Sequence, residues 1–249
     1  MLKLIETYDR IKNIFEGEIE PFESVQLIEE YRRYLKPETV RVVLLAESHV
    51  FTSDEDRLIK IPTIENLRGY PEEYAKFVYC LGYGEKALTK DSNHPKHDGT
   101  PQYWKILFSC NKKSIFSNED FIPILGKISH KKRLENKIKL LKDLKKKGVW
   151  LVDASIVSVY NHGRKPPRSL MNKIIKKSWE SYTRDVVISS NPAHIICIGR
   201  GVANTVENDL KKYFPNNHTI IPQPNAHLTA KEHLANYNRY SKICSGLTG

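Results

Sequence analysis

Four short runs of hydrophobic residues in this chain have the length and composition of buried β-strands. Each run is rich in Val, Ile or Leu and is bounded by polar residues, Gly or Pro, as is typical of strands that are covered on both faces of a sheet. The runs lie at 40–46, 149–154, 194–199 and 219–222. We therefore predict a buried, mainly parallel sheet of four strands.

Segments with helical periodicity lie before and between these runs. Hydrophobic residues recur at helical spacing from Ile5 to Phe15, and a second amphipathic stretch covers 21–34. Further helices are predicted near 72–81, 103–109, 131–147, 169–189, 202–213 and 231–243. Helices that connect parallel strands cover both faces of the sheet. The expected fold class is an α/β three-layer α/β/α sandwich, formed by residues 1–249 as one domain on which the helices of residues 1–39 pack.

The charge balance adds a basic surface to this picture. Among 249 residues, 40 Lys and Arg stand against 29 Asp and Glu, which gives a formal net charge of +11 and a pI near 9.3. Such a charge favours phosphate-rich partners, although lysine-rich composition also serves solubility alone. No hydrophobic run approaches the ~18 residues of a membrane helix, and the start of the chain shows no signal-like core. We expect a cytoplasmic monomer without membrane contact.

Polar residues follow the predicted strands directly. The first strand runs into Glu47, Ser48 and His49, the second ends at Asp153, and the fourth runs into Gln223. Because ligands of such folds gather at the carboxyl ends of the strands, we expect the chemistry there. A Glu in this place is suited to holding or activating water, while capping a turn or pairing with a lysine are the alternatives.

Four segments together resemble the uracil-DNA glycosylase superfamily. The sequence Ala-Glu-Ser-His at 46–49 resembles its first motif, where a polar residue positions the attacking water. The segment 148–154 resembles the strand that delivers an Asn to the base edge, with Asp153 in that place. The segment 196–203 resembles the later strand and Gly turn, and Pro-Gln-Pro-Asn at 222–225 stands where a His-Pro-Ser-Pro motif would fall.

The resemblance implies a catalytic role for three residues. Glu47 would orient or deprotonate the water that attacks the sugar carbon. Gln223 would replace the family His and donate a hydrogen bond to the departing base. Asp153 as a carboxylate only accepts, and an unpaired buried polar group costs ~1–3 kcal/mol, so the resemblance implies either a base with an exocyclic amine or a ring N–H, or a protonated Asp153.

Further residues would hold the base and the DNA backbone of such an enzyme. Residues expected at the base are Ser48, His49, Tyr79, Tyr83, Tyr103 and Trp104, of which each aromatic ring could equally belong to the core. Residues expected at DNA are Arg200 at a helix start, Asn225 in the last motif, His227 and Leu228 as a wedge, and the basic cluster Arg164, Lys165 and Arg168. An ordinary loop is the alternative for the wedge, and a tight turn is the alternative for the glycines beside Arg200.

Two other features do not add to the predicted site. The basic residues of the helix at 131–147 are interpreted mainly as its solvated face. The sequence His-Pro-Lys-His-Asp at 94–98 lies in a polar loop without a distant partner set, and the four cysteines are scattered without a Cys-x-x-Cys pair. We therefore expect neither a metal nor a cofactor.

The resemblance thus implies a DNA glycosylase that hydrolyses the N-glycosidic bond of a flipped, damaged base, with single- or double-stranded DNA as partner. One alternative is a nucleic-acid-binding relative that has lost catalysis, because the family His and Asn are both replaced. The other is an enzyme that acts on free nucleotides or nucleosides, which would not need a broad basic surface.

Overall fold

A computed structural model gives the fold, and it describes residues 2–15, 18–89, 99–160, 166–224 and 227–247. Arg164, Lys165 and Asn225, as well as the loop 94–98, lie outside the described residues.

The four predicted strands form one sheet in which all neighbours are parallel. The strands are β1 (Val42–Ala46), β2 (Val149–Asp153), β3 (His194–Ile198) and β4 (His218–Ile221), in the order β2-β1-β3-β4. In the register of β1 and β2, Ala46 lies opposite Asp153. β1, β2 and β3 are buried along nearly their whole length, which confirms the interpretation of their hydrophobic runs.

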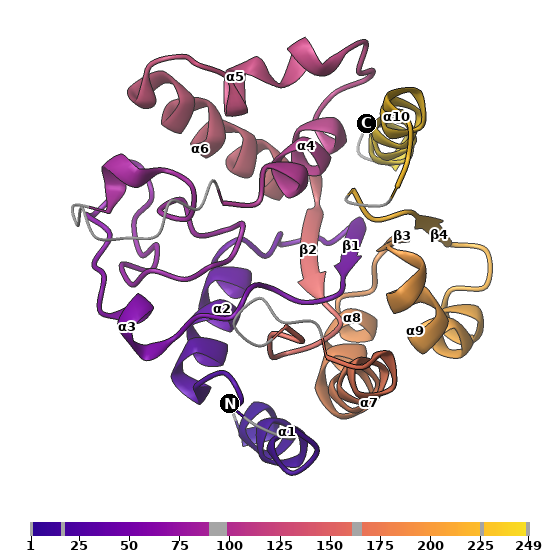
Figure 1. The fold of residues 1–249 in the computed structure, drawn as a ribbon. Helices are drawn as coiled ribbons and strands as arrows, with labels where there is room; N and C mark the ends of the chain where they lie inside the picture. Colours follow the sequence, from indigo (N-terminus) through magenta and orange to yellow (C-terminus); the bar gives the residue numbers. More distant parts are fainter. Residues whose placement is uncertain (1, 16–17, 90–98, 161–165, 225–226, 248–249) are drawn as a thin grey trace.

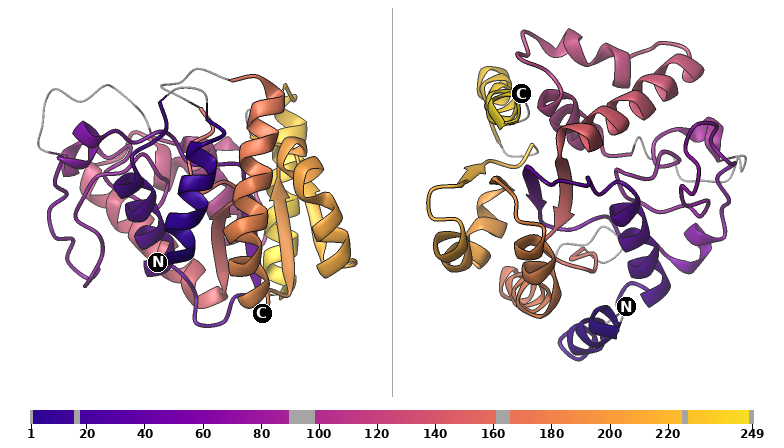
Figure 2. Two further views of the ribbon diagram at one scale, coloured as in Figure 1. Left: turned by 90° about the horizontal axis from the view of Figure 1, so that it is seen from below. Right: turned by 180° about the vertical axis from the view of Figure 1, so that it is seen from behind.

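Helices cover both faces of this sheet, so the predicted three-layer α/β/α architecture is confirmed (Figures 1 and 2). One layer holds α1 (Leu2–Lys12), α7 (Arg168–Ser178), α8 (Arg184–Ser189) and α9 (Arg200–Tyr213). The other holds α4 (Pro101–Cys110), α5 (Ile122–Leu125), α6 (His130–Lys147) and α10 (Ala230–Leu247). The remaining elements are α2 (Phe22–Tyr34), α3 (Asp54–Arg57), the 3-10 turns Lys86–Leu88 and Asn118–Phe121, and the π-helical segment Trp179–Thr183 between α7 and α8.

Local signals set the ends of α6 and lead the chain into β2. The hydroxyl of Ser129 caps the first turn by accepting from the N–H of Lys132. Gly148 ends the helix in the left-handed conformation, at φ 80°. A Cβ there would lie 2.7 Å from the backbone oxygen of Thr39, so the chain needs glycine at this crossing.

The helix predicted at 72–81 is absent, and that prediction is wrong. The backbone of this segment pairs with residues 59–61: Ile61 donates to the oxygen of Glu72, and Tyr74 donates to that of Ile59. Nearly all side chains from residue 74 to 81 are buried, so the segment has no polar face to present to water. Burial on all sides favours this irregular, aromatic-rich path over an amphipathic helix.

The N-terminal helices pack against the α/β unit. α1 lies against α7, and α2 lies beside β2, where the indole N–H of Trp150 donates to the backbone oxygen of Arg32 at 2.9 Å. The hydroxyl of Tyr31 donates to the backbone oxygen of Glu73 at 2.7 Å. Within the described ranges, no helix is long and apolar enough to cross a lipid bilayer.

Candidate active site

The carboxyl ends of the strands surround a cavity of about 270 Å³ that is lined by two of the three predicted catalytic residues. Glu47 and Gln223 both contribute to it, together with Tyr103 and Tyr160. Asp153 lines a smaller cavity of about 60 Å³ beside the first. The two cavities share the walls formed by Ser48, His49, Val50, Thr100 and Tyr103, so the three predicted residues lie around two adjacent cavities.

The β-ladder continues past β1 and β2 and fixes the position of Glu47. The N–H of Ala154 donates to the oxygen of Ala46 at 2.8 Å, and the N–H of Ser155 donates to the oxygen of Glu47 at 3.0 Å. The Glu47 side chain is 6 % exposed, and its Oε2 accepts a hydrogen bond of 3.0 Å from the hydroxyl of Tyr160. No lysine, arginine or histidine of the described residues forms an ion pair with Glu47.

The partner of Glu47 is a stable proton donor. Burial, followed by the negative charge of Glu47, raises the pKa of Tyr160 to about 12. The phenol therefore stays protonated at neutral pH and holds one carboxylate oxygen, while Oε1 has no hydrogen-bond partner among the described side chains. A second phenol, Tyr103, lies in the same wall, and burial, then Asp153 and Glu47, raise its pKa above the ordinary value.

Gln223 reaches the cavity because residue 199 is a glycine. Gly199 ends β3 with φ 100°, a conformation that favours glycine, and its N–H donates to the oxygen of Ile221 at 2.8 Å. A Cβ at this position would lie 2.5 Å from Cγ of Gln223, so the Gln223 side chain lies directly across the Gly199 backbone. The Gln223 amide has no hydrogen-bond partner among the described residues.

Asp153 is bound by two cationic side chains. Its Oδ2 accepts a bond of 3.3 Å from Arg32 on α2 and a bond of 3.2 Å from Nδ1 of His49. The carboxyl group is 2 % exposed. Only Oδ1 is left to accept from a ligand.

His49 is a buried imidazolium between two carboxylates. Its Nε2 contacts Oε2 of Glu20 at 2.7 Å, and Nδ1 contacts Asp153. Burial acts to lower its pKa, but the charges and hydrogen bonds of Glu20 and Asp153 raise that pKa to about 9. Both ring nitrogens are occupied, so His49 forms part of the cavity wall without a free donor for a base.

Three residues of this network escaped the sequence analysis: Glu20, Glu29 and Arg32. Glu20 also accepts from the backbone N–H groups of Thr52 and Ser158, both at 2.9 Å, and Glu29 pairs with Arg32. The signal for Glu29 and Arg32 was present, since both fall on the buried side of α2. Charged residues on the hydrophobic side of a predicted helix indicate a buried ion pair.

Of the four predicted aromatic residues, the structure brings Tyr103 alone to the cavity. The hydroxyl of Tyr79 accepts from the N–H of Leu151 at 2.7 Å within the core, and the ring of Tyr83 packs edge-on against Tyr74. Trp104 is buried beneath the ammonium of Lys137, 4.6 Å from its ring centroid. The core alternative therefore holds for Tyr79, Tyr83 and Trp104.

The residues expected at DNA that the structure describes lie around this edge and outside both cavities. Arg200 is the exposed first residue of α9, and Arg168 is the exposed first residue of α7. The guanidinium of Arg168 lies directly over Gly201, so both arginines meet at the N-terminus of α9. His227 is exposed and Leu228 is half-buried in the loop between β4 and α10.

Comparison of the chain with protein-family models, with curated proteins and with solved structures finds no match.

Proposed function

We propose that this protein is a DNA glycosylase, which hydrolyses the bond between a damaged base and its sugar after the nucleotide has left the stack. The observation that carries the proposal is the state of Glu47, a buried carboxylate with one hydrogen bond and no ion-pair partner among the described residues. A buried carboxylate is costly unless its lone pairs are satisfied. Water or substrate in the 270 Å³ cavity satisfies them.

The position of Glu47 suits the hydrolytic step. Its free oxygen accepts a hydrogen bond from water and directs that water to the sugar carbon. As the bond from the water oxygen to this carbon forms, the bond from the carbon to the base nitrogen breaks. The electron pair leaves with the base, which takes up the proton that the water loses. The carboxylate also stabilises the positive charge that develops on the sugar.

Gln223 and Asp153 offer complementary contacts to the base. The Gln223 amide donates to a carbonyl oxygen on which charge develops as the base leaves. Asp153 only accepts, through Oδ1, because Arg32 and His49 occupy Oδ2. This pair favours a base that carries a carbonyl group and an N–H donor, and it disfavours a second carbonyl at Asp153. The phenol of Tyr103 adds a donor in the wall that the two cavities share.

Two arginines beside the cavity offer positive charge to the phosphates of the substrate. Arg168 and Arg200 meet at the start of α9, a helix of 14 residues whose N-terminus favours an anion. The net charge of +11 adds long-range attraction to DNA.

The test is cleavage of oligonucleotides that contain uracil, hypoxanthine, xanthine or other damaged bases, read as alkali-labile abasic sites. We expect Glu47→Gln to lower the single-turnover rate by roughly 10²–10⁴-fold, because it removes the group that orients the water. Glu38→Gln, at an exposed position, is the matched control and keeps the rate. Cleavage that survives Glu47→Gln would contradict the assigned role. Hydrolysis of free nucleosides without cleavage in DNA would favour the alternative enzyme class.

A further inference from the structure

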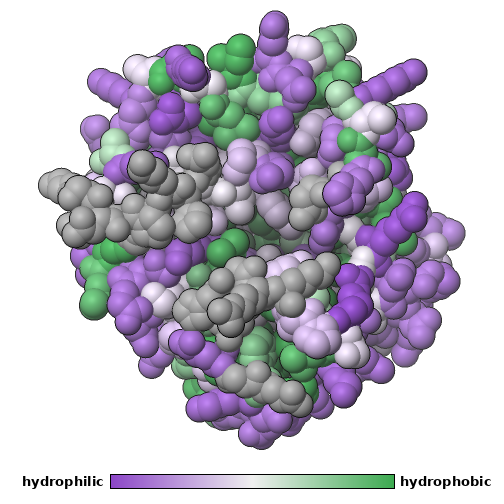
Figure 3. Space-filling model, in the orientation of Figure 1, coloured by the Kyte–Doolittle hydropathy of each residue, from purple (hydrophilic) through white to green (hydrophobic). Residues whose placement is uncertain are grey.

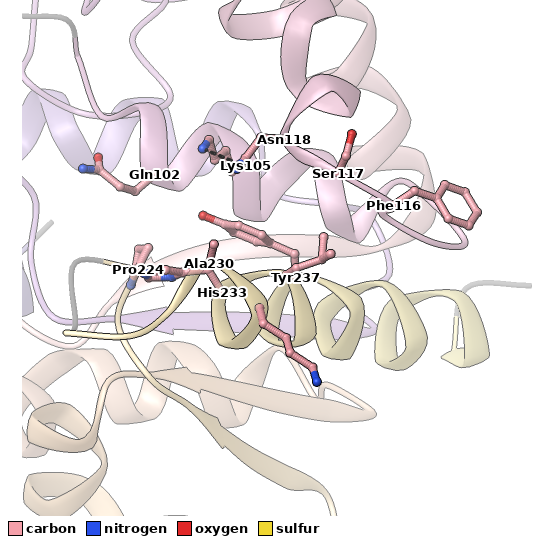
Figure 4. Close-up of a pocket in the computed structure, with 11 residues that line it drawn as sticks. Gln102, Lys105, Phe116, Ser117, Asn118, Pro224, Ala230, His233 and Tyr237 are labelled. Carbon is pink, nitrogen blue, oxygen red and sulfur yellow. Dashed lines mark hydrogen bonds between the residues drawn. The ribbon is translucent and has the colours of Figure 1, made fainter.

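A larger groove between α4 and α10 adjoins the cavity at Glu47. This groove has a volume of about 620 Å³, and Gln102 and Pro224 line it as well as the smaller cavity. Figure 4 shows Gln102 and Pro224 at one end, Phe116 at the other, and Lys105 and Tyr237 between them. The groove therefore leads away from the candidate active site along the surface.

The described lining of the groove is basic and contains no acidic residue. Lys105, Lys231 and His233 contribute to it. The first turn of α10 is capped by Thr229, whose hydroxyl accepts from the N–H of Glu232 while the Glu232 carboxylate accepts from the N–H of Thr229. The attraction for an anion comes from the side chains of the groove and not from this helix end.

Lys105 is a partly desolvated cation without a carboxylate partner among the described residues. Its ammonium donates to Oδ1 of Asn118 at 3.2 Å and lies 5.2 Å from the ring centroid of Phe121. Burial lowers its pKa, and no described acid pairs with it to offset that cost. An anionic ligand in the groove provides the missing partner.

An exposed aromatic ring stands at the far end of the groove on a fixed loop. Phe116 is 81 % exposed. Asn238 of α10 holds the backbone of Ile115 through two hydrogen bonds, of 2.9 and 2.7 Å. The carboxylate of Asp120 accepts from the N–H groups of Phe116 and Ser117. The loop thus holds a ring in solvent, where a nucleobase has access to its face.

We infer that the groove between α4 and α10 binds single-stranded nucleic acid next to the flipped nucleotide, with a phosphate at Lys105 and a base stacked on Phe116. Positive charge combined with aromatic stacking platforms is the pattern by which proteins hold single strands. The inference rests on the proposed function, because the nucleotide in the Glu47 cavity fixes where the strand enters the groove.

The test is binding of a fluorescent single-stranded oligonucleotide, and of the matching duplex, over a range of salt concentrations. We expect Lys105→Gln to reduce the slope of log affinity against log salt by about 0.7, the value of one single-strand phosphate contact. Phe116→Ala should weaken single-strand binding at least about fivefold through lost stacking. Because Phe116 is exposed, its replacement leaves the fold intact, and thermal melting verifies this for both variants.

Lys142→Gln, on the exposed face of α6, removes the same charge and should leave affinity and slope unchanged. The inference is overturned if the wild type does not bind the single strand, if both groove variants bind like the wild type, or if the loss appears for the duplex alone. Base excision decides the proposed function separately. If the protein binds single strands through Lys105 but excises no base, the groove is a binding site and the glycosylase proposal is wrong. If it excises a base but the groove variants bind like the wild type, the glycosylase proposal stands and the groove inference is wrong.

Discussion

Glu47 and His49 leave the same strand end two residues apart, yet the structure gives them opposite surroundings. Glu47 has one phenolic donor and an open side toward the cavity. His49 has a carboxylate at each ring nitrogen. At the scale of single residues, the sequence therefore identifies Glu47 and His49 as candidates. Their surroundings are set by Tyr160, Glu20 and Asp153, which lie far away in the chain. One group is left open for chemistry, and the other is committed to holding the wall in place.

The buried His49 predicts a particular dependence of stability on pH. Its pKa is 6.5 in the unfolded reference and about 9 in the fold, so folding takes up a proton between these values. The stabilisation is complete below pH 6.5 and is lost as the pH rises through 9. We expect the free energy of unfolding to fall by up to about 3 kcal/mol over this range. Urea denaturation at a series of pH values measures it.

The same measurement on His49→Gln and Glu20→Gln separates this group from others that titrate in the range. His49→Gln should remove the His49 part of the decline, and Glu20→Gln should make that part smaller, because it removes the larger of the two attractive charges. A decline that is equal in wild type and both variants would show that His49 does not bind the extra proton on folding.

At the scale of elements, the basic residues of α6 differ in their surroundings, although they look alike in the sequence. The sequence indicated a solvated basic face, and most of its lysines are exposed or half-buried. Lys137 is different: it is buried over Trp104 and donates to Oε1 of Glu85 at 2.6 Å. Arg133 donates to both oxygens of Glu85 at 2.8 Å. Glu85 thus ties the irregular segment before α4 to α6.

We expect Glu85→Gln to destabilise the fold by about 3 kcal/mol, because it leaves the buried ammonium of Lys137 without its counter-charge. Asp143→Asn, which removes the half-buried partner of the exposed Lys139 on the same helix, should cost less than about 1 kcal/mol. Chemical denaturation of both variants measures the two values. Equal, small effects would show that the Glu85 cluster adds little to stability.

At the scale of the whole molecule, the N-terminal helices belong to the site as well as to the core. Glu20 and Arg32 come from this part of the chain and hold His49 and Asp153 at the end of the sheet. The face seen in Figure 3 is largely hydrophilic, with small separate hydrophobic areas. Such a surface suits a charged, hydrated partner better than a broad apolar one.

We therefore expect a chain that begins at residue 40 to lose cooperative unfolding and near-UV circular dichroism. Such a chain lacks α1 and α2, which uncovers β2, removes Glu20 from the buried His49 and removes Arg32 from the buried Asp153. A chain that begins at residue 18 keeps Glu20 and α2 and should still unfold cooperatively, at lower denaturant. Native-like unfolding of the shorter chain would show that residues 1–39 are a separate addition to the domain.

The sequence by itself determined the strands, most helices and the sheet edge where Glu47 and Gln223 meet. Hydrophobic period and end signals act locally, and parallel strands bring their carboxyl ends to one edge. Only the tertiary structure decided which groups pair there and which aromatic ring faces the cavity. Those outcomes depend on contacts such as that of Arg32 with Asp153, 121 residues apart, and on burial from all sides, as in 72–81. The helical period of α2 places Arg32 on the buried side but does not name its partner, and the path of 72–81 follows no period. Both are set by what the fold places opposite a residue and not by its neighbours in sequence.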